Sequence, residues 1–143
     1  KIHYKLVKNL YHISNMISGY PKPLIKDPFL GFSINTLVNQ YSSKVIVLVR
    51  HPAAIVDSYK RVGWNVRFDR FIENEEHKFI YHKYKKHIDK CLQDKSNIAL
   101  NVATMWYILY DSIIHSENEE NAVLWVRHED LSKSPDIYYK KMV

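Results

Sequence analysis

The most distinct features of the hydrophobic pattern are two runs of consecutive apolar residues bounded by polar ones. The first run, 45–49, contains four β-branched side chains, and the second covers 122–126. Continuous apolar runs of this length are typical of strands that are covered on both faces. The sequence therefore predicts buried strands at 44–50 and 122–127.

Between and around these runs, the apolar residues recur at helical spacing. Helices are expected at 1–18, from a Ser33 cap to about 41, from Pro52 to about 61, from an Asn74 cap to about 93, after a cap at Ser96 or Asn97, and from Pro135 onward. The inner stripe of the 74–93 helix is expected to hold Phe79, Ile80, Tyr84, Ile88, Cys91 and Leu92. Segments 23–28 and 64–74 are expected to be extended and irregular, respectively. Strands separated by helices indicate an α/β fold with a mainly parallel sheet.

Composition narrows the class of protein. The 143 residues suit one domain, and 46% apolar with 25% charged residues is a globular balance. No apolar run approaches the roughly 18 residues of a membrane span, so none is expected in this segment. The single cysteine, Cys91, excludes an internal disulfide and any Cys-based zinc site. A reducing compartment, and hence a cytoplasmic location, is the expectation.

The net charge of +6 is compatible with a nucleic acid, an acidic lipid surface or a phosphorylated ligand. Because the basic residues are scattered and those at 83–90 alternate with apolar positions, a solvated helix face explains them. Trp106 and Trp125 lie on apolar stripes and are expected in the core, so no nucleic-acid partner is expected; a basic nucleic-acid-binding module remains a weaker alternative. His82 and His87 are five residues apart and share no helix face, so no metal site is expected.

Arginines end both predicted strands, where ligands bind in open α/β sheets. Arg50 closes the first strand and Arg127 the second. A guanidinium group beside the N-terminus of the helix that starts at Pro52 would favour a phosphate. The hydroxyl group of Ser58, eight residues after Arg50, would reach the same anion if the helix folds back over the strand. Alternatively, Arg50 pairs with Asp27 or Asp57 and Ser58 is an ordinary surface serine; the pattern alone leaves both readings open.

The stretch 44–59 resembles the 3′-phosphate-binding strand-turn-helix of the sulfotransferase family. In that family, an arginine at a strand end and a serine eight residues later hold the 3′-phosphate of 3′-phosphoadenosine 5′-phosphosulfate (PAPS), and Arg50 and Ser58 match both positions. Segment 24–29 is similar to the family's "K-D-P" strand end. Segment 124–131, with Pro135, is similar to its "Y-E-D-L…P" strand and turn. The resemblance covers residues 22–143.

The resemblance implies a P-loop-NTPase-like three-layer sandwich and transfer of a sulfuryl group from PAPS to an acceptor hydroxyl or amine. Arg50 and Ser58 would bind PAPS or adenosine 3′,5′-bisphosphate, and His128 would stack on the adenine. Lys26 would neutralise charge on the bridging oxygen as it leaves, with Asp27 the adjacent candidate catalytic group. Pro28 stands where one branch of the family has a histidine base, so that base cannot be carried over. Glu129 and Asp130 are expected to be structural.

The sequence lacks the glycine-containing 5′-phosphosulfate loop of the family. The expectation is therefore one partial sulfotransferase-like domain over residues 1–143, incomplete at both ends, that holds the 3′-phosphate half of the site and has weak or no turnover alone. The alternative is a non-catalytic sulfotransferase-like binding or scaffold domain, and a phosphosulfate loop upstream would discriminate between the two. Segment 63–75 is either part of an acceptor lid or a plain surface loop.

Overall fold

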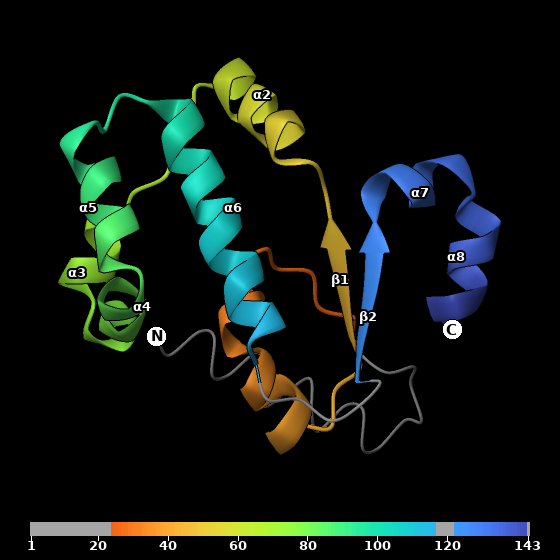
Figure 1. Cartoon of the computed structure of the whole chain (residues 1–143). Helices are drawn as coiled ribbons and strands as arrows, with labels where there is room; N and C mark the ends of the chain where they lie inside the picture. The colour runs from red at the N-terminus through yellow and green to blue at the C-terminus, as the bar shows by residue number, and fades with distance from the viewer. Residues whose placement is uncertain (1–23, 117–121, 143) are drawn as a thin grey trace.

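A short parallel sheet organises the fold. The structure, a computed structural model, describes residues 24–116 and 122–142. Strand β1 (Val45–Val49) pairs in parallel with β2 (Val123–Arg127), with Val45 opposite Val123 and Val49 opposite Arg127 (Figure 1). Both predicted strands and their parallel pairing are confirmed, and the molecule is a mixed α/β structure.

Helices make up most of the remaining described residues. Before β1 lie the 3₁₀-helix η1 (Leu30–Ser33) and the π-helix η2 (Thr36–Gln40). The connection from β1 to β2 contains α2 (Pro52–Val62), α3 (Asp69–Glu73), the 3₁₀-helix η3 (Glu75–His77), α4 (Lys78–Lys83), α5 (Lys85–Gln93) and α6 (Ile98–Ile114). Helices α7 (His128–Lys133) and α8 (Pro135–Met142) follow β2. None of the helices in the described ranges is long and apolar enough to cross a membrane.

The ends of the helices follow the local sequence signals where those are strong. Helix α2 begins with Pro52 in its first turn and ends at Gly63, whose φ of 67° is readily adopted only by glycine. The side chain of Asn97 caps α6 by accepting from the N–H of Leu100 at 3.0 Å. Pro135 opens α8 as predicted. The helix expected at 1–18 lies outside the described residues.

Three expectations about the helices are wrong. Ser33 caps nothing, because the helical segment already begins at Leu30 and continues through a π-helical turn. The predicted 74–93 helix is broken at Tyr84, whose φ of −112° and ψ of 23° leave the helical region; Phe79 is 59% exposed instead of lying on the inner face. A short helix, α3, forms within the segment that was expected to be irregular.

The sheet is covered unequally on its two faces. Val47 is 7% exposed and packs against α6 and the η1–η2 segment, whereas Ile46 and Leu48, on the opposite face, are 41% and 44% exposed. The expectation that β1 is covered on both faces is therefore wrong for these residues. An apolar run cannot by itself distinguish a half-covered strand from a fully covered one.

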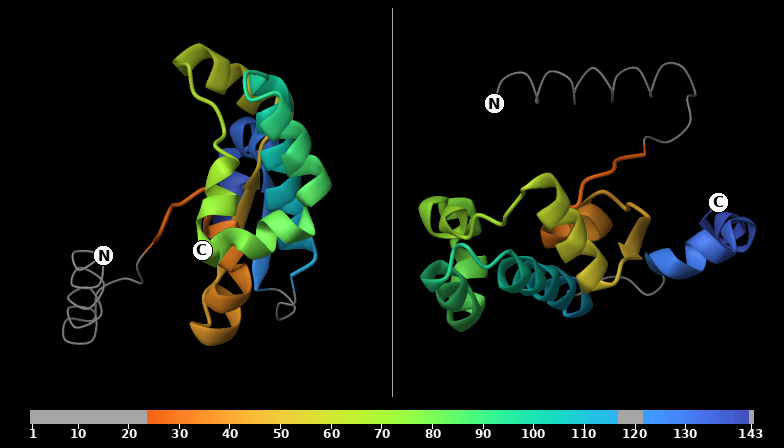
Figure 2. Two further views of the ribbon diagram at one scale, coloured as in Figure 1. Left: turned by 90° about the vertical axis from the view of Figure 1, so that its left-hand side faces the viewer. Right: turned by 90° about the horizontal axis from the view of Figure 1, so that it is seen from above.

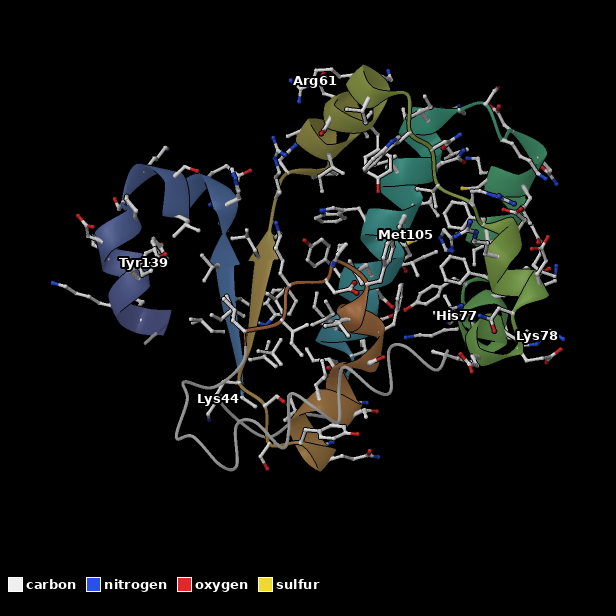
Figure 3. The ribbon with its side chains drawn as sticks, turned by 180° about the vertical axis from the view of Figure 1, so that it is seen from behind. Lys44, Arg61, His77, Lys78, Met105 and Tyr139 are labelled. Carbon is white, nitrogen blue, oxygen red and sulfur yellow. The ribbon has the colours of Figure 1, made fainter. Side chains whose placement is uncertain are left out.

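Helix α6 joins two hydrophobic clusters. Through Ile108 it contributes to a cluster with α3, α4 and α5, against which Met105 also packs (Figure 3). Through Ile113 it contributes to a second cluster with β1 and the η1–η2 segment. The buried members of the first cluster are Phe68, Phe71, Ile80, Tyr84, Ile88, Cys91 and Ile108. The position of the sheet relative to the outer helices therefore depends on α6.

Gly31 allows η1 to pack closely on α6. A Cβ atom at this position would lie 2.8 Å from the terminal Cδ1 atoms of Leu109 and Ile113. We expect Gly31→Ala to lower the free energy of unfolding by about 1–3 kcal/mol through overpacking, measured by urea titration. In the double variant with Leu109→Ala, the total loss should be smaller than the sum of the two single losses, because truncating Leu109 removes one of the two close contacts of the added methyl group. Strict additivity would contradict this packing.

Candidate functional site

The carboxyl ends of the two strands lie side by side, and three of the candidate residues lie in the segments that follow them. Arg50 directly follows β1, next to Arg127 at the end of β2. Ser58 lies in the second turn of α2, and His128 is the first residue of α7. The side chains of Arg50, Ser58 and His128 are all half-buried. The strand ends, α2 and α7 thus frame one region, as Figure 1 shows.

The guanidinium group of Arg50 forms no ion pair with any residue of the described ranges. The alternative pairing with Asp27 or Asp57 is therefore not found. Arg127 differs, since its Nε atom lies 3.8 Å from Oδ2 of Asp130. Within this part of the chain, Arg50 remains a half-buried cation with its charge available to a ligand.

Lys26 and Asp27 lie apart from any regular element. Residues 24–27 form no strand, so the expected strand end is absent there. Both side chains are exposed, and Figure 2 shows this orange segment projecting from the body of the helices. Oδ1 of Asp27 accepts a hydrogen bond from the backbone N–H of Phe29 at 2.7 Å, which fixes a local turn. Within the described ranges, neither Lys26 nor Asp27 forms a hydrogen bond or an ion pair with Arg50.

The backbone donors at the start of α2 are already used by protein groups. Nδ1 of His51 accepts from the N–H of Ala53 at 3.2 Å, and Pro52 has no N–H. The N–H groups of Ala54 and Ile55 both donate to the carbonyl oxygen of His51, at 3.0 and 3.4 Å. The start of this helix, which was expected to favour a phosphate, therefore has protein partners for its first backbone N–H groups. An anion here would depend on side chains, chiefly the guanidinium of Arg50 and the hydroxyl of Ser58.

Two aromatic side chains of α6 bind the outer edge of β1. Nε1 of Trp106 donates to the carbonyl oxygen of Arg50 at 2.9 Å, and the hydroxyl of Tyr110 donates to that of Leu48 at 3.0 Å. The two rings are 4.8 Å apart, and burial raises the pKa of Tyr110. Sequence reasoning assigned Trp106 to the apolar core and missed its donor role. The available signal was a pair of aromatic residues with polar tips, one helical turn apart.

Glu129 makes a second contact that sequence reasoning missed. Its Oε1 accepts from the backbone N–H of His51 at 3.0 Å, which links the start of α7 to the turn after β1. This hydrogen bond is the main reason that the pKa of Glu129 is lowered, and the charges of Arg127 and His128 add to the effect. The carboxylate is therefore ionised at neutral pH and holds the turn that follows Arg50.

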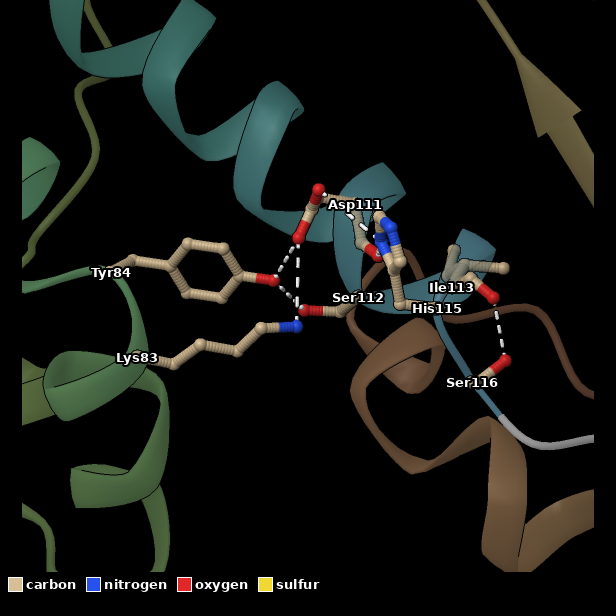
Figure 4. Close-up of polar contacts among 7 residues, drawn as sticks. All are labelled: Lys83, Tyr84, Asp111, Ser112, Ile113, His115 and Ser116. Atoms are coloured by element: carbon tan, nitrogen blue, oxygen red, sulfur yellow. Dashed lines mark hydrogen bonds and ion pairs between the residues drawn. The ribbon is translucent and has the colours of Figure 1, made fainter.

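A second polar cluster joins the helix break at Tyr84 to the end of α6 (Figure 4). The hydroxyl of Tyr84 donates to Oδ2 of Asp111 at 2.7 Å and lies 3.0 Å from Oγ of Ser112. Nζ of Lys83 is 3.5 Å from Oδ2 of Asp111, and Nδ1 of His115 is 3.3 Å from its Oδ1. The Tyr84 hydrogen bond is the largest cause of the lowered pKa of Asp111, whereas burial raises the pKa of Tyr84.

A small pocket of about 180 Å³ lies between the loop at 65–69, the end of α5 and the start of α6. Its polar groups bind mostly one another: Nδ2 of Asn65 donates to the carbonyl of Lys95 at 2.6 Å, and Nδ2 of Asn101 donates to Oδ1 of Asn65 at 3.1 Å. Arg67, in the segment considered as a lid, pairs with Asp69 at 2.5 Å. These contacts tie the segment to the helices beneath it.

The residues in the described ranges include no group of three or more His, Cys, Asp or Glu side chains that could hold a metal ion. Comparison with known proteins finds no family model, curated protein or solved structure that matches this chain. The residues at the strand ends are therefore the ones from which a function can be inferred.

Proposed function

We propose that this chain carries the 3′-phosphate half of a sulfotransferase site, which uses PAPS to transfer a sulfuryl group to an acceptor hydroxyl or amine. The observation that carries the proposal is Arg50, a half-buried guanidinium group without an ion-pair partner in the described ranges, at the carboxyl end of a parallel strand. The strand leads directly into α2, which holds Ser58 eight residues later. This supports the match to the strand-turn-helix of the family.

The residues present fit the phosphate of such a donor. A guanidinium fork can bind two oxygens of a phosphate group, and charge-assisted hydrogen bonds of this kind are about twice as strong as neutral ones. In the proposed complex, Arg50 binds the 3′-phosphate, Ser58 donates its hydroxyl hydrogen to the same group, and His128 stacks on the adenine. PAPS, when bound, supplies the sulfuryl group. We also propose that the two-stranded sheet is part of the P-loop-NTPase-like three-layer sandwich of this family.

The chemistry proposed for this chain is positioning and charge neutralisation. In-line transfer depends on holding donor and acceptor in register, and on cations that offset charge developing on the leaving oxygen. Lys26 is proposed for the second role, with Asp27 beside it as the candidate catalytic carboxylate. Their exposed segment would have to fold against the strand ends for this, because residues 24–27 form no strand with β1.

That exposed position favours one alternative, a non-catalytic domain that binds the nucleotide or a protein partner without transferring the sulfuryl group. Lys26 and Asp27 are both solvent-exposed and neither contacts Arg50 through a bond among the described residues. Assays of any longer chain with sulfuryl acceptors distinguish the enzyme from the non-catalytic domain. Turnover that disappears in Lys26→Ala supports the enzyme, whereas nucleotide binding without turnover supports the non-catalytic domain.

The binding half of the proposal is tested by calorimetric titration with adenosine 3′,5′-bisphosphate and with 5′-AMP. Loss of hydrogen bonds to a charged group costs about 1.5–3 kcal/mol, so we expect a preference for the bisphosphate of about tenfold to a hundredfold. Arg50→Ala should abolish that preference and leave the affinity for 5′-AMP unchanged.

Arg61→Ala is the matched control, because Arg61 lies in the last turn of the same helix and is exposed (Figure 3). It removes an equal charge and should keep the preference. Equal affinity of the wild-type chain for the two nucleotides, or a preference that survives Arg50→Ala, would contradict the proposed site.

A further inference from the structure

The peptide group that follows Arg50 is held from both of its ends by side chains from distant parts of the chain. Its carbonyl oxygen, that of Arg50, accepts from Nε1 of Trp106 at 2.9 Å. Its N–H group, that of His51, donates to Oε1 of Glu129 at 3.0 Å. The two side chains come from α6 and α7, 56 and 78 residues away in sequence. One peptide plane thus connects three elements.

Holding this plane restricts the backbone at Arg50. Because the peptide group is rigid and planar, fixing both its carbonyl and its N–H sets the ψ angle of Arg50 and the φ angle of His51. The direction in which the Cα–Cβ bond of Arg50 leaves the chain is then fixed as well. A long, flexible arginine side chain loses considerable rotamer entropy on binding a ligand. A fixed Cα–Cβ direction reduces the number of conformations that the side chain loses.

The neighbouring contact of Tyr110 is similar in chemistry but differs in place. Its hydroxyl binds the carbonyl oxygen of Leu48, two residues earlier in β1. That peptide group already belongs to the strand, which pairs with β2 as far as Val49. The Arg50–His51 peptide lies beyond the last paired residue, so the sheet itself does not hold it. Among the described residues, it is bound by the side chains of Trp106 and Glu129.

We propose that Trp106 and Glu129 are positioning residues for Arg50, which aim its guanidinium group at the anionic group of the ligand. This inference rests on the proposed function, because it concerns the 3′-phosphate that Arg50 is proposed to bind. Neither residue touches the ligand. Both act through the orientation of one peptide group.

The test uses the ratio of the affinities for adenosine 3′,5′-bisphosphate and 5′-AMP, measured by calorimetry on the 143-residue chain. Trp106→Phe keeps an aromatic ring but removes the donor, and Glu129→Ala removes the acceptor. Each should reduce the ratio about fivefold to tenfold, as misplacement of a binding group by a fraction of an ångström commonly does. The affinity for 5′-AMP should not change. A general loss of structure would lower that affinity as well, so this measurement distinguishes the two causes.

Two conservative variants are the controls. Glu129→Gln keeps an oxygen that can accept from the N–H of His51, and should retain most of the ratio. Tyr107→Phe removes the hydroxyl of an exposed tyrosine on the same helix and should retain the ratio entirely, since no contact of Tyr107 reaches the backbone of Arg50 among the described residues. Thermal unfolding of each variant checks that it folds; if Trp106→Phe does not, Glu129→Ala and Glu129→Gln decide the question.

The possible outcomes separate the two proposals. If the wild-type ratio is lost in Arg50→Ala but is unchanged in both Trp106→Phe and Glu129→Ala, the positioning role is overturned and the proposed function stands. If the wild-type chain shows no preference at all, both are overturned. A ratio that falls in Tyr107→Phe as much as in Trp106→Phe also overturns the positioning role, because the effect would then come from α6 in general.

Discussion

Replacing Ile108 with alanine is expected to lower the free energy of unfolding by about 3–5 kcal/mol, the upper part of the range for a buried Ile→Ala change. The side chain of Ile108 is fully buried in the cluster that α6 forms with α3, α4 and α5. Its removal takes away apolar contacts and leaves a cavity in a closely packed interior. The melting temperature should fall by roughly 10 °C for a chain of this size.

Ile114→Ala is the matched control for this change. Ile114 is also an isoleucine of α6, and the substitution is the same, but its side chain is 65% exposed. Its replacement should change the free energy of unfolding by about 0.5 kcal/mol or less. Chemical denaturation of both variants in parallel measures the difference. If both lose the same stability, α6 cannot be packed through the face that carries Ile108.

The second large effect is expected at Asp111, where Asp111→Asn should cost about 1–3 kcal/mol at neutral pH. The carboxylate accepts from the hydroxyl of Tyr84 at 2.7 Å, and Lys83 and His115 flank it at 3.5 and 3.3 Å. An amide at this position retains one acceptor but loses the negative charge that the ammonium group of Lys83 faces. Tyr84→Phe should cost a similar amount, and the double variant should cost less than the sum.

The same contact predicts how stability depends on pH. Because the pKa of Asp111 is lower in the folded chain than in the unfolded one, mainly through Tyr84, its contribution is complete above the unfolded pKa. That contribution is lost as the pH falls through the lower, folded pKa. Wild-type stability should therefore decrease more steeply than that of Asp111→Asn in acid below about pH 4.

Denaturation midpoints at a series of pH values measure this difference between the two proteins. The comparison with Asp111→Asn is needed because Asp69, Asp89 and Glu129 also have lowered pKa values and contribute to the slope of the wild-type chain. Parallel curves for wild type and variant would show that Asp111 does not contribute through its charge.

The elements that could be predicted from the sequence are those whose signals are local. Signals that lie within a few residues predict the apolar runs of β1 and β2, the ends of α2 at Pro52 and Gly63, and the Asn97 cap of α6. Wherever packing against a distant element decides the outcome, the prediction fails. The break at Tyr84 is one such place, since its hydroxyl is bound to Asp111 and Ser112 on another helix.

The candidate site divides in the same way. Arg50 and Ser58 could be identified because they lie eight residues apart on one strand-turn-helix segment. Trp106 and Glu129 could not, because their contacts with the Arg50–His51 peptide span 56 and 78 residues and involve backbone atoms, which every residue type presents alike. The exposure of Ile46 and Leu48 was missed for a related reason: an apolar run shows that a strand is apolar, not how many helices cover it.

The long connection between the two strands has a consequence for the order of events during synthesis. A ribosome that adds roughly 5–20 residues per second needs about 4–16 s to cover the 78 residues that separate His51 from Glu129. β1 is therefore made several seconds before the strand it pairs with, and it leaves the ribosome ahead of that strand by the same interval. An unpaired apolar strand readily associates with other chains, so aggregation at this stage, and not the stability of the finished sheet, is expected to limit the yield when translation is fast and chains are crowded.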